Sequence, residues 1–269
     1  MLGWLSAMLL AQAEAPEPPP EPQEYVRPQV ISPLPGQLDD VPVFNSNSPE
    51  LVGNPGILLS TFPPTNVEHP NAHLDFAFEG RFDIFAHHVY RADTEDLTDL
   101  YLGILVFNAT DETLTIDVLA GASYLSQPDA PFISLPAVQA FAPSNPVYAG
   151  PGSRVMGVLL QDARQESLPG QITLAPNEAK MLLNLPIPVA ELEPPINGRS
   201  TLMRLRSTGP VYLASLAQYA DAEGNAPDLE TWKQLLVEGD LSEPRDRPPT
   251  PIVENPEGVI YGRVAGVSQ

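Results

Sequence analysis

The 269-residue chain has no cysteine and few cations, and each absence narrows what the protein can do. Without cysteine there is no thiol nucleophile, and no disulfide framework from which to read a compartment. The chain carries 13 lysine and arginine residues against 34 aspartate and glutamate residues, a net charge of −21. Such an acidic body repels phosphate backbones and anionic lipids, so we expect neither nucleic acid nor a membrane surface as partner.

Long hydrophobic runs are also absent, and the apolar segment at the start of the chain is short. Residues 2–10 are largely apolar and precede the small-x-small pattern Ala11-Gln12-Ala13, which recurs as Ala13-Glu14-Ala15. A short apolar core before such a cleavage site is typical of a secretory signal peptide and is too short to span a bilayer. We therefore predict a signal peptide over residues 1–15, no transmembrane helix in the mature chain, and an extracytoplasmic location in the periplasm, the outer envelope or the medium.

Proline, in contrast, is abundant. It supplies 33 of the 269 residues, more than twice the usual share of about 5%. Each proline fixes φ and removes a hydrogen-bond donor, which excludes a long helical bundle and a coiled coil. Glycine, with 18 residues, has no third-residue period, which excludes collagen. Residues 16–27 alternate acid and proline and are predicted to form an extended acidic linker.

The rest of the chain, residues 28–269, is predicted to be all-β, with an antiparallel β-sandwich-like body. The predicted strand–turn–strand pairs are 101–108 with 113–120, 172–174 with 180–185, and 200–206 with 211–219, and a further strand is predicted at 258–267. One short helix is predicted at about 228–238, capped by Asp228 and ended by Gly239 in the left-handed conformation. A sub-domain boundary near residue 195 and a C-terminal truncation are left open.

Several stretches resemble a known family. They are FNSNSPEL (44–51), GILLSTFPP (56–64), GRFDIFAHHVYR (80–91), YLSQPDAPF (124–132), YAGPGSRVM (148–156), NGRSTLMRLRSTGPVYLASLA (197–217) and YGRVAGV (261–267). Together they resemble the uncharacterised exported cyanobacterial proteins that are grouped as a domain of unknown function. The resemblance covers nearly the whole chain after the signal, and it brings no catalytic or binding residues with it. Members of that family usually extend beyond the YGRVAGV-like stretch.

Histidines and aspartates gather between residues 73 and 88, where they suggest a metal site. If residues 73–90 form a hairpin that turns at Glu79-Gly80, alternation places one histidine and one aspartate on a face of each strand. Imidazole and carboxylate groups on facing strands can hold zinc or another divalent ion. The candidate ligands are His73, Asp75, Asp83 and His87. Structurally hydrogen-bonded histidines are the alternative, and His88 is expected to point the other way.

Two further features suggest ionic ligands. The oxygen-rich loops 93–99 and 221–225 suit calcium, although neither has the EF-hand pattern. The C-terminal third holds a group of arginines that could dock a carboxylate or an anionic glycan, and whose alternative role is internal ion pairing. These arginines are Arg199, Arg204, Arg206, Arg245 and Arg247, of which Arg204 and Arg206 are predicted to share a strand face.

Motifs for catalysis are missing from the sequence, which has no GxSxG elbow, phosphate-binding glycine loop or dinucleotide fingerprint. We therefore predict an exported, non-catalytic β protein of the cell envelope or extracellular space, without a cofactor, with a structural or binding role towards envelope polysaccharide or other envelope proteins. One alternative is a carbohydrate-active or divalent-metal hydrolase that uses the His73/Asp75/Asp83/His87 cluster. Another is a calcium-dependent adhesion module. The aromatic residues Tyr101, Tyr124, Tyr148, Tyr212, Tyr219 and Trp232 are candidates for a sugar-stacking platform or for the core.

Overall fold

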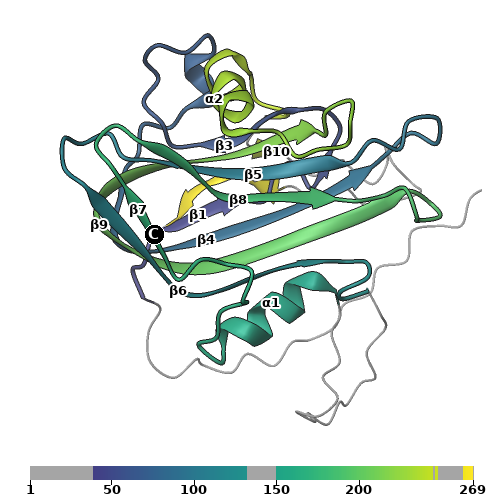
Figure 1. Cartoon of the computed structure of the whole chain (residues 1–269), viewed down its shortest axis with the longest axis horizontal. Helices are drawn as coiled ribbons and strands as arrows, with labels where there is room; N and C mark the ends of the chain where they lie inside the picture. Colours follow the sequence, from purple (N-terminus) through teal and green to yellow (C-terminus); the bar gives the residue numbers. More distant parts are fainter. Residues whose placement is uncertain (1–38, 132–149, 245, 248–262, 269) are drawn as a thin grey trace, which may run out of the picture. The chain divides into compact units, whose positions relative to one another are not determined.

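Two β-layers share one long strand, β9 (Ile196–Tyr219), in the computed structural model, which describes residues 39–131, 150–244, 246–247 and 263–268. The first half of β9 pairs with β4 (Phe78–Arg91) on one side and β6 (Leu114–Leu125) on the other. Its second half pairs with β3 (Gly56–Ser60) and β5 (Leu100–Phe107). Figure 1 shows β9 curving from one layer into the other. We call the layers the first and the second sheet.

The first sheet has the spatial order β12–β1–β4–β9–β6–β7, with β2 also paired to β4, and the second has the order β3–β9–β5–β8. The remaining bounds are β1 (Val43–Ser46), β2 (Leu51–Val52), β7 (Gln171–Leu174), β8 (Ala179–Ile187) and β12 (Gly266–Ser268), with η1 (Pro70–Ala72) between β3 and β4, and β10 (Asp246–Arg247) and β11 (Arg263–Val264) as a separate pair. The predicted all-β, sandwich-like class is confirmed. It is not purely antiparallel, because β1 and β2 run parallel to β4.

The main core lies between the two sheets and follows from alternation along the strands. Every second residue of β4 and β6 is buried, including Phe82, Ile84, Ile116 and Val118. Phe78 is also buried there, and its ring lies 5.0 Å from that of Phe82, centroid to centroid. Burying each such side chain stabilises the fold by about 1.5–3 kcal/mol. Smaller clusters fill one end of the sandwich and the space beneath helix α2 (Leu229–Glu238).

The predicted hairpins 101–108/113–120 and 172–174/180–185 are wrong in their pairing, although all four strands exist. β5 pairs with β8 and β9, whereas β6 pairs with β7 and β9, so each pair that is consecutive in sequence is split between the sheets. Asn108 explains the local geometry. This buried side chain donates to the carbonyls of Glu112 (2.7 Å), Leu174 (3.3 Å) and Ala175 (3.0 Å), and so ties together the two connections that cross between sheets.

The predicted turn at 207–210 is also wrong, because β9 runs straight through it. Gly209 and Pro210 lie where the strand leaves the first sheet and enters the second. The Ser207 hydroxyl donates to the Gly209 carbonyl (2.6 Å), and a Cβ on Gly209 would lie 2.7 Å from Leu114 Cδ2. Glycine and proline therefore mark a change of sheet here and not a reversal of the chain.

The predicted helix is confirmed as α2 (Leu229–Glu238), with the Asp228 carboxylate accepting a hydrogen bond from the Thr231 amide (2.8 Å). Gly239 is not left-handed as predicted, since its φ is −80°. A Cβ at Gly239 would lie 2.4 Å from the Leu235 carbonyl oxygen, so close approach is what requires glycine. α2 covers the outer face of the second sheet, with Trp232 fully buried (Figure 1).

A second helix, α1 (Pro151–Leu159), covers the outer face of the first sheet and is not predicted from the sequence. Its N-cap is Gly150, which offers no side-chain cap, and two glycines lie within it. Packing holds it in place: Val155 and Leu159 are buried, and the Arg154 guanidinium carbon lies 4.0 Å from the centroid of the Tyr124 ring. Tertiary contacts thus stabilise a helix of weak intrinsic propensity.

Residues from Asp40 onwards form one compact unit, and β9, which begins at residue 196, lies at its centre. The predicted strand at 258–267 is described only in part, as β11 and β12. The predicted signal peptide, linker and Arg245 lie outside the described residues. In the part of the chain that the structure describes, no helix is both long and apolar enough to cross a membrane.

Candidate functional site

The hairpin on which the metal-site hypothesis rests is not formed, because residues 78–91 are the single strand β4. Gly80, the predicted turn, has φ +68° at an irregularity in the β4–β9 pairing, so its glycine serves a bulge. Asp83 and His87 are four residues apart on one strand, which separates them by about 13 Å. Asp75 is exposed, with φ +53°. The four candidates are therefore not brought together.

Each of these histidines instead has local partners. The His73 Nδ1 atom lies 2.8 Å from the Ser60 hydroxyl, and the His87 ring bridges the Ser200 hydroxyl (2.8 Å) and the Glu50 carboxylate (3.4 Å). Asp83 pairs with Arg81. Among the described residues, no group of three or more histidine, aspartate or glutamate side chains is arranged to hold a metal.

His88 points the opposite way from His87, as expected, and is fully buried. Its Nδ1 atom lies 2.7 Å from the Pro49 carbonyl oxygen, which can only accept, so Nδ1 carries the proton. Its Nε2 atom lies 2.9 Å from the Ser46 hydroxyl. His88 thus links β4 to the segment that joins β1 and β2.

The two loops proposed for calcium use their carboxylates to order their own backbones. Asp96 accepts from the hydroxyl (2.6 Å) and the amide (3.0 Å) of Thr98, which lowers the pKa of Asp96. Asp221 accepts from the side-chain amide (3.0 Å) and the backbone amide (2.7 Å) of Asn225, which lowers the pKa of Asp221. Both loops are thus closed by turns of the kind that aspartate favours.

The candidate arginines are divided between two faces of the first sheet. Arg204 and Arg206 share the outer face, as predicted, and Arg204 pairs with Asp162 (2.7 Å). Arg199 lies on the inner face and is buried. The structure describes the backbone of Arg247 in β10 but not its side chain. Arg199 therefore cannot act together with Arg204 and Arg206 on one ligand.

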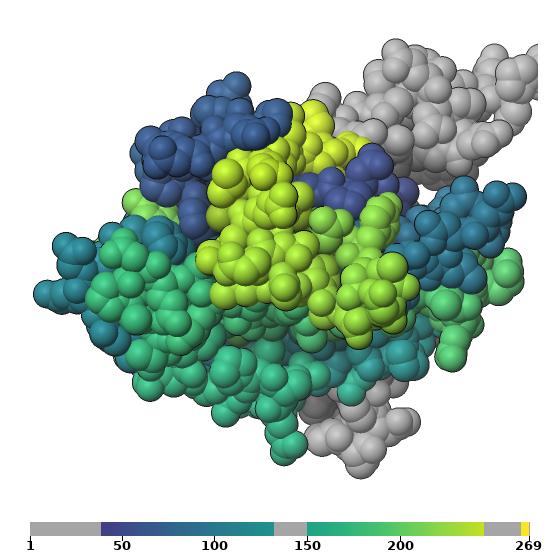
Figure 2. Space-filling model, turned by 45° about the horizontal axis from the view of Figure 1, so that its top comes forward, coloured from purple at the N-terminus to yellow at the C-terminus, as the bar shows by residue number. Residues whose placement is uncertain are grey.

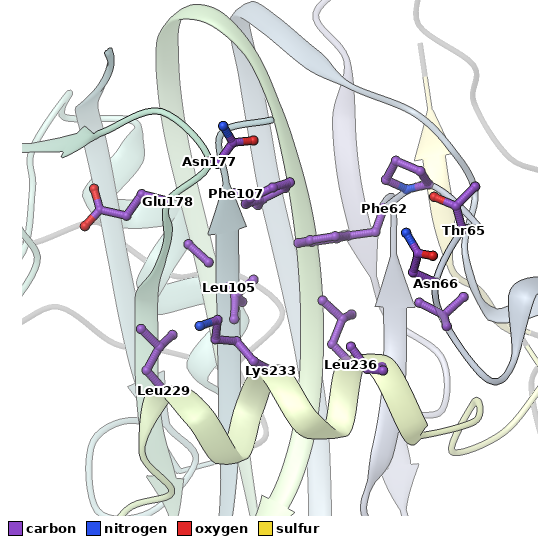
Figure 3. Close-up of a pocket in the computed structure, with 14 residues that line it drawn as sticks. Phe62, Thr65, Asn66, Leu105, Phe107, Asn177, Glu178, Leu229, Lys233 and Leu236 are labelled. Carbon is purple, nitrogen blue, oxygen red and sulfur yellow. The ribbon is translucent and has the colours of Figure 1, made fainter. Parts of the chain in front are cut away.

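The candidate site is a pocket of about 570 Å³ between α2 and the second sheet. Four segments that are distant in sequence line it: the loop after β3, the end of β5, the start of β8 with the turn before it, and the inner side of α2. In Figure 3, Leu229, Lys233 and Leu236 point from α2 towards the strands. Figure 2 shows the loop after β3, in blue, against α2, in yellow-green, where the Glu68 amide donates to the Val237 carbonyl (2.8 Å).

The pocket combines an aromatic wall with a polar rim. The Phe62 and Phe107 rings form this wall and stack with their centroids 5.6 Å apart and their planes at 16°. The Tyr212 ring centroid lies 6.0 Å from that of Phe62, but Tyr212 does not line the pocket. Asn66 (φ +59°) and Asn177 (φ +57°) occupy left-handed turn positions at the rim. Neither side-chain amide has a hydrogen-bond partner among the residues that the structure describes. The rim can therefore donate and accept hydrogen bonds.

The charged residues of the pocket are already engaged. The Ala175 amide donates to the Glu178 carboxylate (2.7 Å) and lowers the pKa of Glu178, to which Lys180 at 3.2 Å also contributes. Lys233 pairs with Glu230 (2.8 Å) on the same helix. This site is not predicted from the sequence, because Phe62 and Phe107 are not among the candidates for sugar stacking. The local sequence feature that marks the site is a pair of asparagines in turns, Asn66 and Asn177.

A comparison with protein families identifies the chain. The model of a family described as a protein of unknown function, DUF3370, matches residues 29–269. The chain belongs to the DUF3370 family. No curated protein and no solved structure matches it significantly. Membership of DUF3370 agrees with the resemblance to a domain of unknown function and assigns no activity to the pocket beneath α2.

Proposed function

We propose that this DUF3370 protein is an exported, non-catalytic binding protein of the cell envelope, and that the pocket beneath α2 holds a ring of a neutral envelope polysaccharide. The observation that carries the proposal is the pairing of the stacked Phe62–Phe107 wall with the rim amides of Asn66 and Asn177. A volume of about 570 Å³ lies within the usual range for small-ligand sites.

The ligand class follows from the chemistry of the lining. A sugar ring has an apolar face, which suits an aromatic wall, and hydroxyl groups at its edge, which suit side-chain amides that both donate and accept. The net charge of −21 disfavours polyanionic glycans, so a neutral polysaccharide fits best. Among the lining residues Glu178 is the single carboxylate, whereas glycoside cleavage ordinarily uses a pair. This supports binding without hydrolysis.

Export is supported by the sequence alone, through the apolar segment and the small-x-small sites at residues 1–15 and the acidic proline-rich linker that follows. Cell fractionation with N-terminal sequencing tests this part. We expect a chain that begins after residue 13 or 15 and is recovered outside the cytoplasm. An uncleaved chain in the cytoplasm would refute export.

Calorimetric titration of the mature chain with neutral oligosaccharides and envelope polysaccharide tests the binding site. The informative variants are Asn66→Gly and Asn177→Gly, because glycine keeps a left-handed backbone while the amide is lost. Each lost hydrogen bond should weaken binding about 2- to 10-fold. The matched control is Asp162→Gly, at another left-handed position, beyond α1. Binding that is absent, or that both asparagine variants leave unchanged, would reject the site.

A further inference from the structure

Arg199 is a cation buried between the two sheets of the sandwich. It is 7% exposed. Its Nε and Nη2 atoms donate to the Pro186 carbonyl (3.0 and 2.7 Å), and Nη1 donates to the Ser123 hydroxyl (3.1 Å). Both acceptors are neutral. Among the described residues, none provides a carboxylate oxygen within 4.0 Å of this guanidinium, which therefore lacks an ion-pair partner.

Asp129 acts on Arg199 without forming a direct ion pair with it. Asp129 influences Arg199 only through space, and its carboxylate accepts the Leu125 amide (2.8 Å). A buried charge without a counter-charge destabilises a fold, because neutral hydrogen bonds replace only part of its hydration. Three of the five guanidinium N–H groups are used in the bonds described, so two remain for another acceptor.

A small cavity lies beside Arg199. Thr201 and Ser215 supply its hydroxyl groups, and aliphatic side chains from both sheets, including Ala86, Ile104 and Leu183, form the rest of its wall. Ser215 is 1% exposed. Its hydroxyl has no hydrogen-bond partner in the part of the chain that the structure describes. A buried hydroxyl without a partner, beside a cation that has no direct ion-pair partner, indicates an occupant that accepts hydrogen bonds.

We propose that this cavity binds a single small inorganic anion, namely chloride. Chloride accepts hydrogen bonds from the guanidinium and from Ser215, and it places a negative charge in direct contact with Arg199, which a water molecule does not. The cavity volume of about 10 Å³ leaves room for a single small particle and none for sulfate, phosphate or an organic acid. The aliphatic walls lower the local dielectric constant and so strengthen the attraction between the ion and Arg199.

The proposal is independent of the polysaccharide site, since the cavity lies between the sheets and the pocket lies outside the second sheet. The acidic surface opposes anion entry, so we expect weak binding that saturates only at high chloride concentration. Binding to the folded state alone raises its Tm as the chloride concentration increases.

The first test measures the Tm of the full chain in sodium chloride and in sodium methanesulfonate at matched ionic strength. We expect a higher Tm in chloride, because methanesulfonate is too large for the cavity. Ser215→Ala should reduce this difference and Arg199→Gln should abolish it. Ser242→Ala, which removes an exposed hydroxyl bonded to the Asn54 carbonyl, is the matched control and should respond as the wild type. Equal Tm values in the two salts would overturn the proposal.

The second test locates the ion and does not depend on whether Arg199→Gln folds. Crystals grown in sodium bromide should show an anomalous peak within hydrogen-bond distance of Arg199 and Ser215, and Ser215→Ala crystals should show a weaker peak. Electron density that fits water alone, with no anomalous signal, would overturn the proposal. The proposal would also be overturned if bromide bound only at other places and the Tm of Ser215→Ala responded to chloride as that of the wild type does.

Discussion

The phenol of Tyr90 lies in the buried cluster at one end of the sandwich, where it donates to the Thr98 carbonyl (3.1 Å). Burial, reinforced by the neighbouring Tyr219, Asp96 and Asp99, raises the pKa of Tyr90 to about 12. Because this folded-state pKa exceeds the unfolded value of about 10, the stability that Tyr90 contributes is complete below that unfolded value and is lost as the pH rises towards 12.

We therefore expect an ultraviolet absorbance titration to contain a tyrosine ionisation near pH 12. Tyr90→Phe should remove that phase and flatten the alkaline loss of stability. A Tyr→Phe replacement at another position is the control and should keep the phase. Identical alkaline unfolding curves for the wild type and Tyr90→Phe would contradict the assignment.

Gly103 on β5 permits the close packing of α2. A Cβ at this position would lie 2.9 Å from Trp232 Cε2 and 2.8 Å from Met181 Cε. Gly103→Ala should therefore lower the free energy of unfolding by about 1–3 kcal/mol, as overpacking does, measured by urea denaturation. The same replacement at Gly53, where a new Cβ meets nothing within 4 Å, should change stability by less than about 0.5 kcal/mol. A Trp232→Phe background should reduce the cost at Gly103; equal costs in both backgrounds would refute the clash.

At the scale of elements, the Asp228 cap of α2 predicts a stability that depends on pH. The Thr231 amide (2.8 Å) and hydroxyl (2.8 Å) donate to the Asp228 carboxylate and lower its pKa. A pKa that is lower in the folded than in the unfolded state stabilises the protein at neutral pH, and this contribution is lost as the pH falls through the folded-state pKa.

Asp228→Ala should accordingly lower the Tm at neutral pH, and the difference from the wild type should shrink as the pH falls through the folded-state pKa of Asp228, where the carboxylate becomes protonated. The Asp228→Asn variant keeps a side-chain oxygen that accepts from the Thr231 amide, so it should lose less and show little pH dependence. Circular dichroism melting curves across this pH range give the comparison. A deficit of Asp228→Ala that persists unchanged in acid would show that the cap does not act through its charge.

The elements also show what the sequence can predict. Alternation and turn residues located β5–β8 and the helix α2, because those signals act within a few residues. Pairing failed where one buried side chain decides it: Asn108 holds two crossing connections that look like hairpin turns in the sequence. The bulge at Gly80 and the change of sheet at Gly209 use the same residue type as a turn, so local composition cannot separate the three cases.

The candidate sites follow the same logic. The pocket beneath α2 joins four segments that lie between residues 62 and 237, and only the folded sandwich places Phe62 on Phe107. Arg199 was named from the sequence as an anion-docking residue, but alternation along β9 sets it on the opposite face from Arg204. Grouping arginines by sequence thus combines a buried cation with Arg204, which forms an ion pair with Asp162 on the outer face.

For the whole molecule, β9 predicts that residues from Asp40 onwards unfold as one cooperative unit, because one strand is central to both sheets. If β9 leaves either sheet, its former neighbours in that sheet lose the hydrogen-bond partners of their backbone groups. The absence of cysteine makes this measurable. With Trp4→Phe, Trp232 reports on the second sheet, and a dye on Leu160→Cys, which is 73% exposed beyond α1, reports on the first.

Urea unfolding curves from these two probes should coincide with each other and with far-ultraviolet circular dichroism. The unlabelled Trp4→Phe chain controls for the dye and should give the same midpoint by tryptophan fluorescence. Two separate midpoints would mean that β9 can be released from one sheet while it is held in the other. Coincident midpoints would mean that the two sheets unfold together. Because β9 passes from one sheet to the other at Gly209 and Pro210, unfolding of either sheet would then unfold the other through this strand.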